Sequence, residues 1–383
     1  MGRAMKVIVI RWGTMESLPP ASSLVRALVR LGHEVTLLCN HLPGGSIADL
    51  GQARTIDLGE YPAVGSSNHL AKRAESLLVL RKSLKKCVDS ADIVWTTSDN
   101  SAVYCLDIIP PEKHVLQLAE LVEYIPLIGS ASLFKSKRFI KQARLAKQVV
   151  VPEINRAFIQ KAWWNLPKTP AVLPNKPWMD CLEPCDPSEE PGFIAVLDRL
   201  STEGKKVVLY QGGFTEDRDL ETYCKAIELL GREYAFCLMG PSNDYQLRLC
   251  EAYEQTIYLG CYEAPRHLYA GLYADVGILP YKSNPGKVAH LSPLNSLFCA
   301  PNKLWEYALV GLPMVGNNLP GLRSVIERNG LGCVAVEGDP GSVAGAIAAT
   351  CEERERFSAR CSKFYGSVDI VHIIDQILAA NVA

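Results

Sequence analysis

Short apolar runs alternate with amphipathic segments along the first half of the chain. Residues 6–11, KVIVIR, are largely apolar, and residues 19–34 begin with two prolines and then show helical periodicity until Gly32. A second apolar run, EVTLLC, occupies residues 34–39. Parallel strands buried on both faces give such runs, so the pattern predicts a β–α–β unit. Similar runs follow at residues 91–97, 114–120, 146–153 and 171–175.

The pattern changes between Lys176 and Lys206, where proline and acidic residues are frequent and no steady period is present. A second alternating series begins at residues 206–213 and continues to residue 318. We therefore predict an α/β protein with two Rossmann-like, doubly wound domains facing across a cleft, with ligands at the carboxyl ends of the strands. The expected divisions are a first domain over residues 1–180, a connection over 181–205, a second domain over 206–365 and a last helix over 366–383.

Composition narrows the class of protein. The chain has 383 residues, of which 48% are hydrophobic and 21% charged, enough for two cores. A net charge of −1 gives no overall basic field, so we do not expect nucleic acid as a partner. The 13 cysteines are scattered singly, mostly in apolar stretches, which favours a reducing cytoplasm, and Cys181 and Cys185 lack zinc-site spacing. We expect neither a signal peptide nor a membrane span, because the first apolar run is short and no long one follows.

Residues 298–318, FCAPNKLWEYALVGLPMVGNN, combine a helix with charged residues in its first turns. Pro301 suits the first helical position, and Gly311 favours a C-terminal end, so we predict a helix over residues 301–310. A helical period divides its side chains into two arcs. The arc expected to pack contains Leu304, Trp305, Ala308 and Leu309, and the presented arc contains Asn302, Lys303, Glu306 and Tyr307.

The presented arc has the chemistry of a nucleotide site. A helix N-terminus carries free backbone N–H groups and a partial positive charge, which Lys303 reinforces, so both would bind a phosphate. Glu306, one turn deeper, would repel a phosphate, and ribose hydroxyls are its natural partner. The ordinary alternative is an exposed Lys–Glu pair that contributes about 0.2–0.5 kcal/mol.

Two other segments favour the nucleotide interpretation. The run VVLY ends in QGGFTEDR, where Gly212 and Gly213 permit close approach of a backbone and Arg218 can reach an anion. Alone, that segment is equally typical of a glycine turn with a solvated arginine. Residues 285–305 contain no acidic side chain. They hold the basic side chains of Lys287, His290 and Lys303, as a diphosphate pocket would.

Three segments carry a resemblance to a known family. They are LYQGGFTEDRDLE, YLGCYEAPRHLYAGLYADVGILPY and PNKLWEYALVGLPMVGNNLPGLRSVIERNGLGCVAVEGDP. Over residues 207–349 the chain resembles the donor half of the retaining glycosyltransferases of family 4, and it does so more weakly in the first half through GHEVTLL and AVLPN. The resemblance implies the GT-B fold, with an N-terminal acceptor-side domain, a C-terminal nucleotide-sugar donor domain and a last helix that crosses back to the N-terminal domain.

The resemblance also implies roles for residues of the donor site. The family's phosphate-binding lysine corresponds to Arg218, and its paired arginine corresponds to Gly213, so one charge is absent here. The ribose-binding glutamate of the Glu-x7-Glu motif corresponds to Glu306. Its first glutamate, which contacts the donor sugar, corresponds to Phe298, the most serious departure.

The sugar and acceptor sides match the family less well. Asn295 and backbone amides near Ser296 are candidate substitutes for the absent sugar contact. A histidine that related sequences place after an N-domain strand corresponds to Ala119, followed by Glu120, our candidate on the acceptor side. Gly13, in the expected loop after the first strand, matches a glycine that lets the backbone approach donor phosphate or acceptor.

By resemblance, the reaction moves a sugar from a UDP- or GDP-type donor to an acceptor hydroxyl with retained anomeric configuration. Departure of the diphosphate is the hard step, so we expect Arg218 and Lys303 to be catalytic by stabilising its charge, with Asn302 beside them. Asp217 and Asp219 spell an Asp-x-Asp metal signature, but they open a helix, where aspartates cap N–H groups. GT-B enzymes generally need no metal, so we expect no metal and no cofactor other than the donor substrate.

For a glycosyltransferase of this kind, we expect the acceptor to be a glycan, a lipid-linked molecule or a small molecule. Residues 133–148 carry six basic residues and no acidic one, between apolar positions. The basic residues are Lys135, Lys137, Arg138, Lys141, Arg144 and Lys147. Such a segment is typical either of a solvated helix or of peripheral contact with the inner face of a membrane, and residues 71–86 add a second basic helix.

Two other classes of function stay open. A sugar-nucleotide epimerase or hydrolase on the same fold would use water or no acceptor. A catalytically silent nucleotide-binding partner subunit is the third hypothesis, motivated by Phe298, Gly213 and Ala119.

Overall fold

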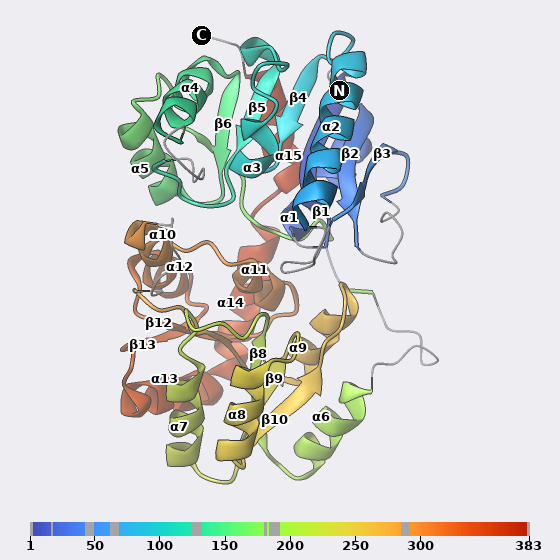
Figure 1. The fold of residues 1–383 in the computed structure, drawn as a ribbon. Helices are drawn as coiled ribbons and strands as arrows, with labels where there is room; N and C mark the ends of the chain where they lie inside the picture. Colours follow the sequence, from blue (N-terminus) through green and yellow to red (C-terminus); the bar gives the residue numbers. More distant parts are fainter. Residues whose placement is uncertain are drawn as a thin grey trace. The chain divides into compact units, whose positions relative to one another are not determined.

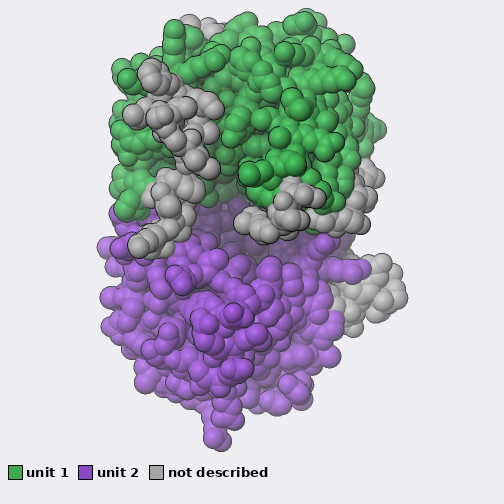
Figure 2. Space-filling view, in the orientation of Figure 1, with its two compact units in different colours: residues 1–178, 290–295, 369–383 green, residues 179–289, 296–368 purple. Residues whose placement is uncertain are grey.

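The structure is a computed structural model, and it describes residues 3–16, 18–42, 50–61, 69–124, 132–179, 182–183, 192–284 and 292–380. The chain divides into two compact units, coloured separately in Figure 2. Unit 1 comprises Met1–Trp178, His290–Asn295 and Asp369–Ala383, and unit 2 comprises Met179–Ala289 and Ser296–Val368. Each unit is built around one parallel sheet (Figure 1).

Unit 1 contains a seven-stranded sheet in the order β3-β2-β1-β4-β5-β6-β7, with every pairing parallel. Its strands are β1 (Lys6–Thr14), β2 (Glu34–His41), β3 (Arg54–Glu60), β4 (Ile93–Thr96), β5 (His114–Gln117), β6 (Gln148–Val151) and β7 (Ala171–Val172). Ile8 and Ile10 of β1 pack with Leu80 and Leu84 on one face of the sheet. Residues 7 and 9, which point to the other face, are also buried, so the strand is covered on both faces. This is why its sequence is a continuous apolar run.

The helices of unit 1 connect and cover these strands. They are α1 (Pro19–Arg30), α2 (His69–Cys87), α3 (Asp99–Val103), η1 (Pro111–Lys113), α4 (Ser132–Leu145), α5 (Ile154–Trp164) and α15 (Ile370–Ala379). The last of them, α15, packs against α1, so the C-terminal segment belongs to the unit that the N-terminal half forms. No helix within the described ranges combines the length and apolar character needed to cross a bilayer.

Unit 2 contains a six-stranded parallel sheet in the order β10-β9-β8-β11-β12-β13. Its strands are β8 (Lys206–Gln211), β9 (Tyr234–Met239), β10 (Thr256–Gly260), β11 (Val276–Leu279), β12 (Met314–Asn317) and β13 (Gly332–Ala335). The helices are α6 (Phe193–Thr202), α7 (Leu220–Leu230), α8 (Asp244–Ala252), η3 (Arg266–Tyr269), α9 (Ala270–Tyr273), α10 (Pro293–Leu297, shared with unit 1), α11 (Asn302–Leu309), α12 (Pro320–Asn329), α13 (Pro340–Glu352) and α14 (Arg354–Gly366). The prediction of two doubly wound α/β domains is confirmed.

Each sheet has a point where the chain reverses its direction of winding. In unit 2, β9 lies on one side of β8 and β11 on the other, and in unit 1, β2 and β4 flank β1 in the same way. Parallel α/β sheets bind ligands outside the carboxyl ends of the strands at such a switch point. The carboxyl end of β8 is therefore the first place to look for a site.

Two details differ from the expectations, and part of the expected connection is not described. Residues 193–202, assigned to the connection, form α6, because Phe193, Ile194, Leu197 and Leu200 repeat at helical spacing and are buried in the core of unit 2. Gly13 lies inside β1, not in a loop after it, at a register shift in the pairing with β2. Residues 184–191 of the expected connection lie outside the described part of the chain.

Candidate functional site

The end of β8 is shaped to receive the side chain of Lys303. Gly212 follows β8 with φ +136, and a Cβ built on it would lie 2.5 Å from both Cε and Nζ of Lys303. The carbonyl of Gly212 is in turn covered by Gly240 after β9, whose added Cβ would come within 2.0 Å of it. Two glycines thus let two strand ends and one lysine lie in direct contact.

Lys303 carries a charge without a direct counterion. Its Nζ lies 5.6 Å from the centre of the Tyr210 ring, and within the described residues no ion pair joins it to a carboxylate. Burial lowers its pKa to about 8, the charge of Glu306 acts in the opposite direction, and the charge of Arg218 lowers the pKa further. An anion placed at this strand end would relieve that penalty.

Arg218 is held beside the same strand end by aromatic rings. Its guanidinium carbon lies 4.0 Å from the centre of the Tyr281 ring, and its backbone forms an isolated bridge to Tyr281, which follows β11. Burial opposes the charge of Arg218, but Tyr281, Tyr210 and Asp217, which pairs with the guanidinium, raise its pKa above the ordinary value. Its Nε is buried and has no hydrogen-bond partner among the residues that the structure describes. Lys303 and Arg218 therefore both lie near the carboxyl end of β8.

Glu306 faces a different neighbour. Its Oε1 lies 3.7 Å from Nε2 of His267, in η3, and both side chains are largely buried. Burial acts to raise the pKa of Glu306, but the interaction with His267 and the charge of Lys303 outweigh it, so the pKa is lowered and the carboxylate is ionised. Nδ1 of His267 is buried without a partner in the described part of the chain.

Helix α11 corrects two expectations. Pro301 is the N-cap of the helix, not its first residue, with φ −71 and ψ 140, and no side chain caps the helix. Tyr307 is not presented but fully buried: it lies over Gly277, where an added Cβ would come within 2.6 Å of its ring, and its hydroxyl accepts from Gln211 N at 3.3 Å. Asn302 and Lys303 remain in the first turn, where the N–H groups lack helical partners.

The Asp-x-Asp segment is engaged with the protein itself. Asp217 pairs with Arg218, and the carboxylate of Asp219 accepts from the Thr222 hydroxyl at 2.8 Å and from Gly338 N at 3.1 Å. The expectation that the aspartates cap helix N–H groups is wrong in detail, because Asp219 occupies the N-cap position without a capping hydrogen bond. Across the described ranges, no three His, Cys, Asp or Glu side chains are grouped to hold a metal ion.

Other candidates of the donor side lie in different surroundings. Gly213 has space for a side chain, since an added Cβ would meet only Thr215 at 4.0 Å. Phe298 is half-buried, and a Cβ added to Gly321 would lie 3.0 Å from its Cα. Ser296 is also half-buried, and its carbonyl accepts from Cys299 N at 3.2 Å. Lys287 and His290 lie outside the described residues.

Asn295 belongs to unit 1 and is tied to the loop after β5. Its Oδ1 accepts from Leu121 N at 2.8 Å, and its carbonyl accepts from Nη2 of Arg156 at 3.0 Å. Arg156, on α5, is almost fully buried and also donates to the carbonyl of Ala119 at 2.9 Å and pairs with Glu120 at 3.5 Å. Arg156 was not predicted, because only the tertiary fold shows these contacts.

Gly13 also contacts a residue that the sequence analysis did not single out. Its φ is +146, its N–H donates to Oδ1 of Asn40 at 3.0 Å, and an added Cβ would lie 3.1 Å from the guanidinium of Arg11. Burial lowers the pKa of Arg11. The end of β1 therefore combines a glycine with a partly buried cation, at the switch point of the sheet in unit 1.

Two Rossmann-like domains in one chain, each with a switch point at the carboxyl ends of its strands, define the GT-B class of fold. Solved structures share it over almost their whole length. One is the Anabaena protein Alr3699/HepE in complex with UDP and glucose, with 15% identity, 97% of this chain and 98% of that chain covered, and a TM-score of 0.66. Sucrose-phosphate synthase from Thermosynechococcus elongatus has 13% identity, coverage of 98% and 95%, and a TM-score of 0.64.

WaaG, a glycosyltransferase involved in lipopolysaccharide biosynthesis, has 13% identity, coverage of 97% and 98%, and a TM-score of 0.60. No protein-family model matches the chain, and no curated protein matches it in sequence. The likeness therefore shows the GT-B fold, as predicted, whereas membership of family 4 stays a prediction.

Proposed function

We propose that this protein is a glycosyltransferase that takes its sugar from a nucleoside diphosphate sugar. The observation that carries the proposal is the ammonium of Lys303, which lies on the Gly212 strand end at a switch point and is not paired with a carboxylate of any described residue. The diphosphate binds there, between Lys303 and Arg218 and against the first N–H groups of α11. Glu306 binds the ribose hydroxyls. The structural neighbour from Anabaena holds UDP and glucose, which supports this choice of ligand.

In the proposed reaction, the bond between sugar and diphosphate breaks while the acceptor hydroxyl attacks and gives its proton to the leaving diphosphate, with retained configuration as the resemblance to family 4 implies. Negative charge grows on the leaving diphosphate, and Lys303 and Arg218 stabilise it in place, which needs no reorganisation of the protein. We propose that no metal ion takes part, since Asp217 and Asp219 are already engaged by Arg218, Thr222 and Gly338. We propose that the reaction needs no cofactor besides its donor and acceptor substrates.

The proposed acceptor is a glycan, a lipid-linked molecule or a small molecule that unit 1 binds. Helix α4 presents Lys137, Arg138 and Lys141 at the surface, while Arg144 donates to the Trp164 carbonyl at 2.7 Å. The exposed cations would allow peripheral contact with an anionic membrane surface in the cytoplasm. Cosedimentation with anionic vesicles tests that part of the proposal separately from catalysis.

The first experiment is a binding screen by calorimetry and thermal shift with UDP, GDP, ADP and dTDP, because a ligand of the folded state raises its stability. The second incubates the donor sugars of the nucleotide that binds with a cell extract and analyses the products. Transfer to an extract component supports the glycosyltransferase. Nucleotide release or sugar isomerisation without transfer would assign the protein to the epimerase and hydrolase class.

Nucleotide binding without turnover would favour the silent partner subunit. That alternative rests on three departures from the family pattern, Phe298, Gly213 and Ala119. Absence of binding to every nucleotide would refute the proposal as a whole.

A further inference from the structure

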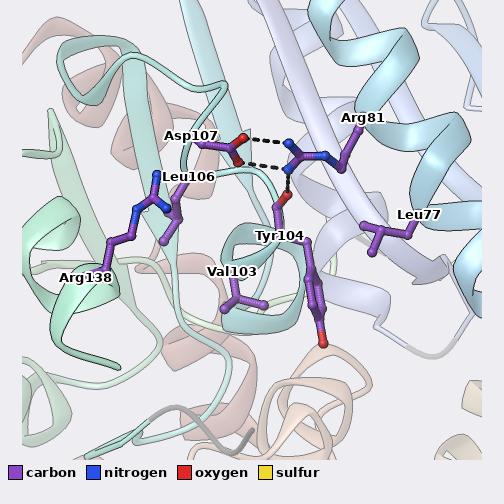
Figure 3. A pocket seen from close by; sticks show the side chains of 7 residues that line it. All are labelled: Leu77, Arg81, Val103, Tyr104, Leu106, Asp107 and Arg138. Atoms are coloured by element: carbon purple, nitrogen blue, oxygen red, sulfur yellow. Dashed lines mark hydrogen bonds and ion pairs between the residues drawn. The ribbon is translucent and has the colours of Figure 1, made fainter. Parts of the chain in front are cut away.

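A cavity of about 330 Å³ lies in unit 1, between α2, α3 and α4 (Figure 3). Leu77, Val103 and Leu106 give it an apolar wall. Its volume falls in the range of about 300–1,000 Å³ that small-molecule pockets occupy. Nothing in the proposed transfer reaction uses this cavity.

One side of the cavity is an ion pair that is already complete. Arg81 donates to both carboxylate oxygens of Asp107, at 2.8 and 2.5 Å, and also to the carbonyl of Tyr104. These hydrogen bonds hold the pKa of Asp107 below its ordinary value. A bidentate pair of this kind is rigid and carries no net charge.

The other charged group is a cation that lacks a partner. Arg138, on α4, lines the cavity from the opposite side, and Figure 3 shows its guanidinium extending past Leu106 toward Asp107. No hydrogen bond or ion pair of Arg138 is formed with any residue in the described ranges, and its charge contributes to lowering the pKa of Asp107, which Arg81 already neutralises. The cavity therefore has a net charge of about +1 above an apolar wall.

We propose that this cavity binds an alkyl phosphate, with the phosphate on Arg138 and the alkyl chain on Leu77, Val103 and Leu106. A guanidinium and a phosphate form two parallel hydrogen bonds. Because Asp107 is already paired with Arg81, it does not form an ion pair with Arg138, and the guanidinium of Arg138 is available to a phosphate. The same chemistry occurs in a soluble phosphate ester and in the head group of a phospholipid. The proposal does not depend on the proposed glycosyltransferase activity.

The test is calorimetry with n-hexyl phosphate, inorganic phosphate and hexanol on the full chain. We expect saturable binding of n-hexyl phosphate in the low millimolar range and weaker binding of the other two, because only the ester uses both parts of the cavity. Arg138→Gln should weaken that binding about tenfold. The matched control is Lys141→Gln, which removes the same charge from an exposed position of the same helix and should change the affinity less than about twofold.

A second pair of variants tests the apolar wall. Leu77→Phe fills the cavity and should abolish binding of n-hexyl phosphate, whereas Leu78→Phe, at an adjacent position that is 70% exposed, should not.

Vesicles of phosphatidic acid and of phosphatidylcholine then distinguish a phospholipid head group from a soluble phosphate ester. Recruitment to phosphatidic acid that Arg138→Gln and Leu77→Phe abolish and Leu78→Phe preserves assigns the site to a lipid, and binding of n-hexyl phosphate without recruitment assigns it to a soluble ester. Equal effects of the two charge variants, or no binding of n-hexyl phosphate by the parent, would overturn the proposal.

Discussion

Replacing Lys303 by methionine should make the ligand-free protein more stable and its nucleotide complex weaker. Methionine keeps the length of the side chain over Gly212 but removes the ammonium. In the folded state the pKa of Lys303 is lowered from 10.5 to about 8, chiefly by burial. At pH 7 the lysine carries its proton in both the folded and the unfolded state, so the folded state bears the whole penalty of burying it.

The magnitude follows from the two pKa values. A difference of about 2.5 pKa units corresponds to about 3 kcal/mol, which we reduce to about 1–2 kcal/mol because the side chain keeps some contact with solvent. Lys303→Met should therefore raise the free energy of unfolding of unit 2 at pH 7 by about 1–2 kcal/mol. As pH rises from 8 toward 10.5, the parent loses its buried charge and the advantage of the variant should disappear.

Nucleotide binding should respond in the opposite sense. A hydrogen bond to a charged group contributes about 1.5–3 kcal/mol, so Lys303→Met should weaken the best nucleotide of the screen by more than about tenfold. The affinity of the parent should itself fall above pH 8, where free Lys303 loses its proton. The variant should show no such fall.

The assay is hydrogen exchange of peptides from β8 and α11 across a urea series, with and without nucleotide, because a chain of two units does not have a single unfolding free energy. Calorimetry gives the affinities. Lys206→Met is the control, since Lys206 is exposed at the opposite end of β8 and should change neither quantity by more than about 0.5 kcal/mol. If Lys303→Met destabilises the free protein, or binds nucleotide like the parent, the assignment of a buried phosphate-binding cation is refuted.

Three further predictions concern single side chains. Glu306→Gln should weaken the nucleoside diphosphate about tenfold but should not weaken pyrophosphate in calorimetry, because pyrophosphate has no ribose and the carboxylate repels it; equal losses would contradict the ribose assignment. Gly212→Ala should cost about 1–3 kcal/mol of stability and displace Lys303, whereas Gly213→Ala should be neutral, and urea unfolding of both variants checks this. Burial lowers the pKa of His114 to about 4, so between pH 7 and pH 5 the unfolded chain binds a proton at this residue and the folded chain does not. The free energy of unfolding of the parent should therefore fall by about 2 kcal/mol more over this pH range than that of His114→Gln, as urea unfolding at the two pH values would measure.

Periodicity in the sequence was sufficient for the two sheets but not for every helix face. Continuous apolar runs such as residues 6–11 identify strands that are covered on both sides, wherever the covering helices lie. Tyr307 was assigned to the wrong face, since its burial depends on the missing side chain of Gly277, 30 residues earlier in a neighbouring strand. Helix α6 was not predicted, because prolines and acidic residues before Phe193 conceal a short helical period.

The sequence identified the individual residues of the candidate site, but it did not predict which of them lie in contact. Gly212 and Lys303 came from separate motifs, and the contact between them comes from the winding of the chain around β8. The contact of Arg156 with Asn295 joins residues 139 positions apart, at a spacing that no local pattern reports. Contacts of this kind follow from topology, which a single sequence does not specify.

The arrangement of Lys303 and Glu306 argues against an ordinary exposed ion pair and leaves the nucleotide site as our proposal. An ordinary pair of opposite charges three residues apart on a helix would be exposed and bonded to each other. Both side chains are described, both are largely buried, and no ion pair joins them: the ammonium lies against Gly212 and the Tyr210 ring, and the carboxylate turns to His267. Their separation leaves a cation at the strand end and an anion beside η3. A ligand that satisfies both must present negative charge at the first position and hydroxyl donors at the second, which is the order of groups along a nucleoside diphosphate.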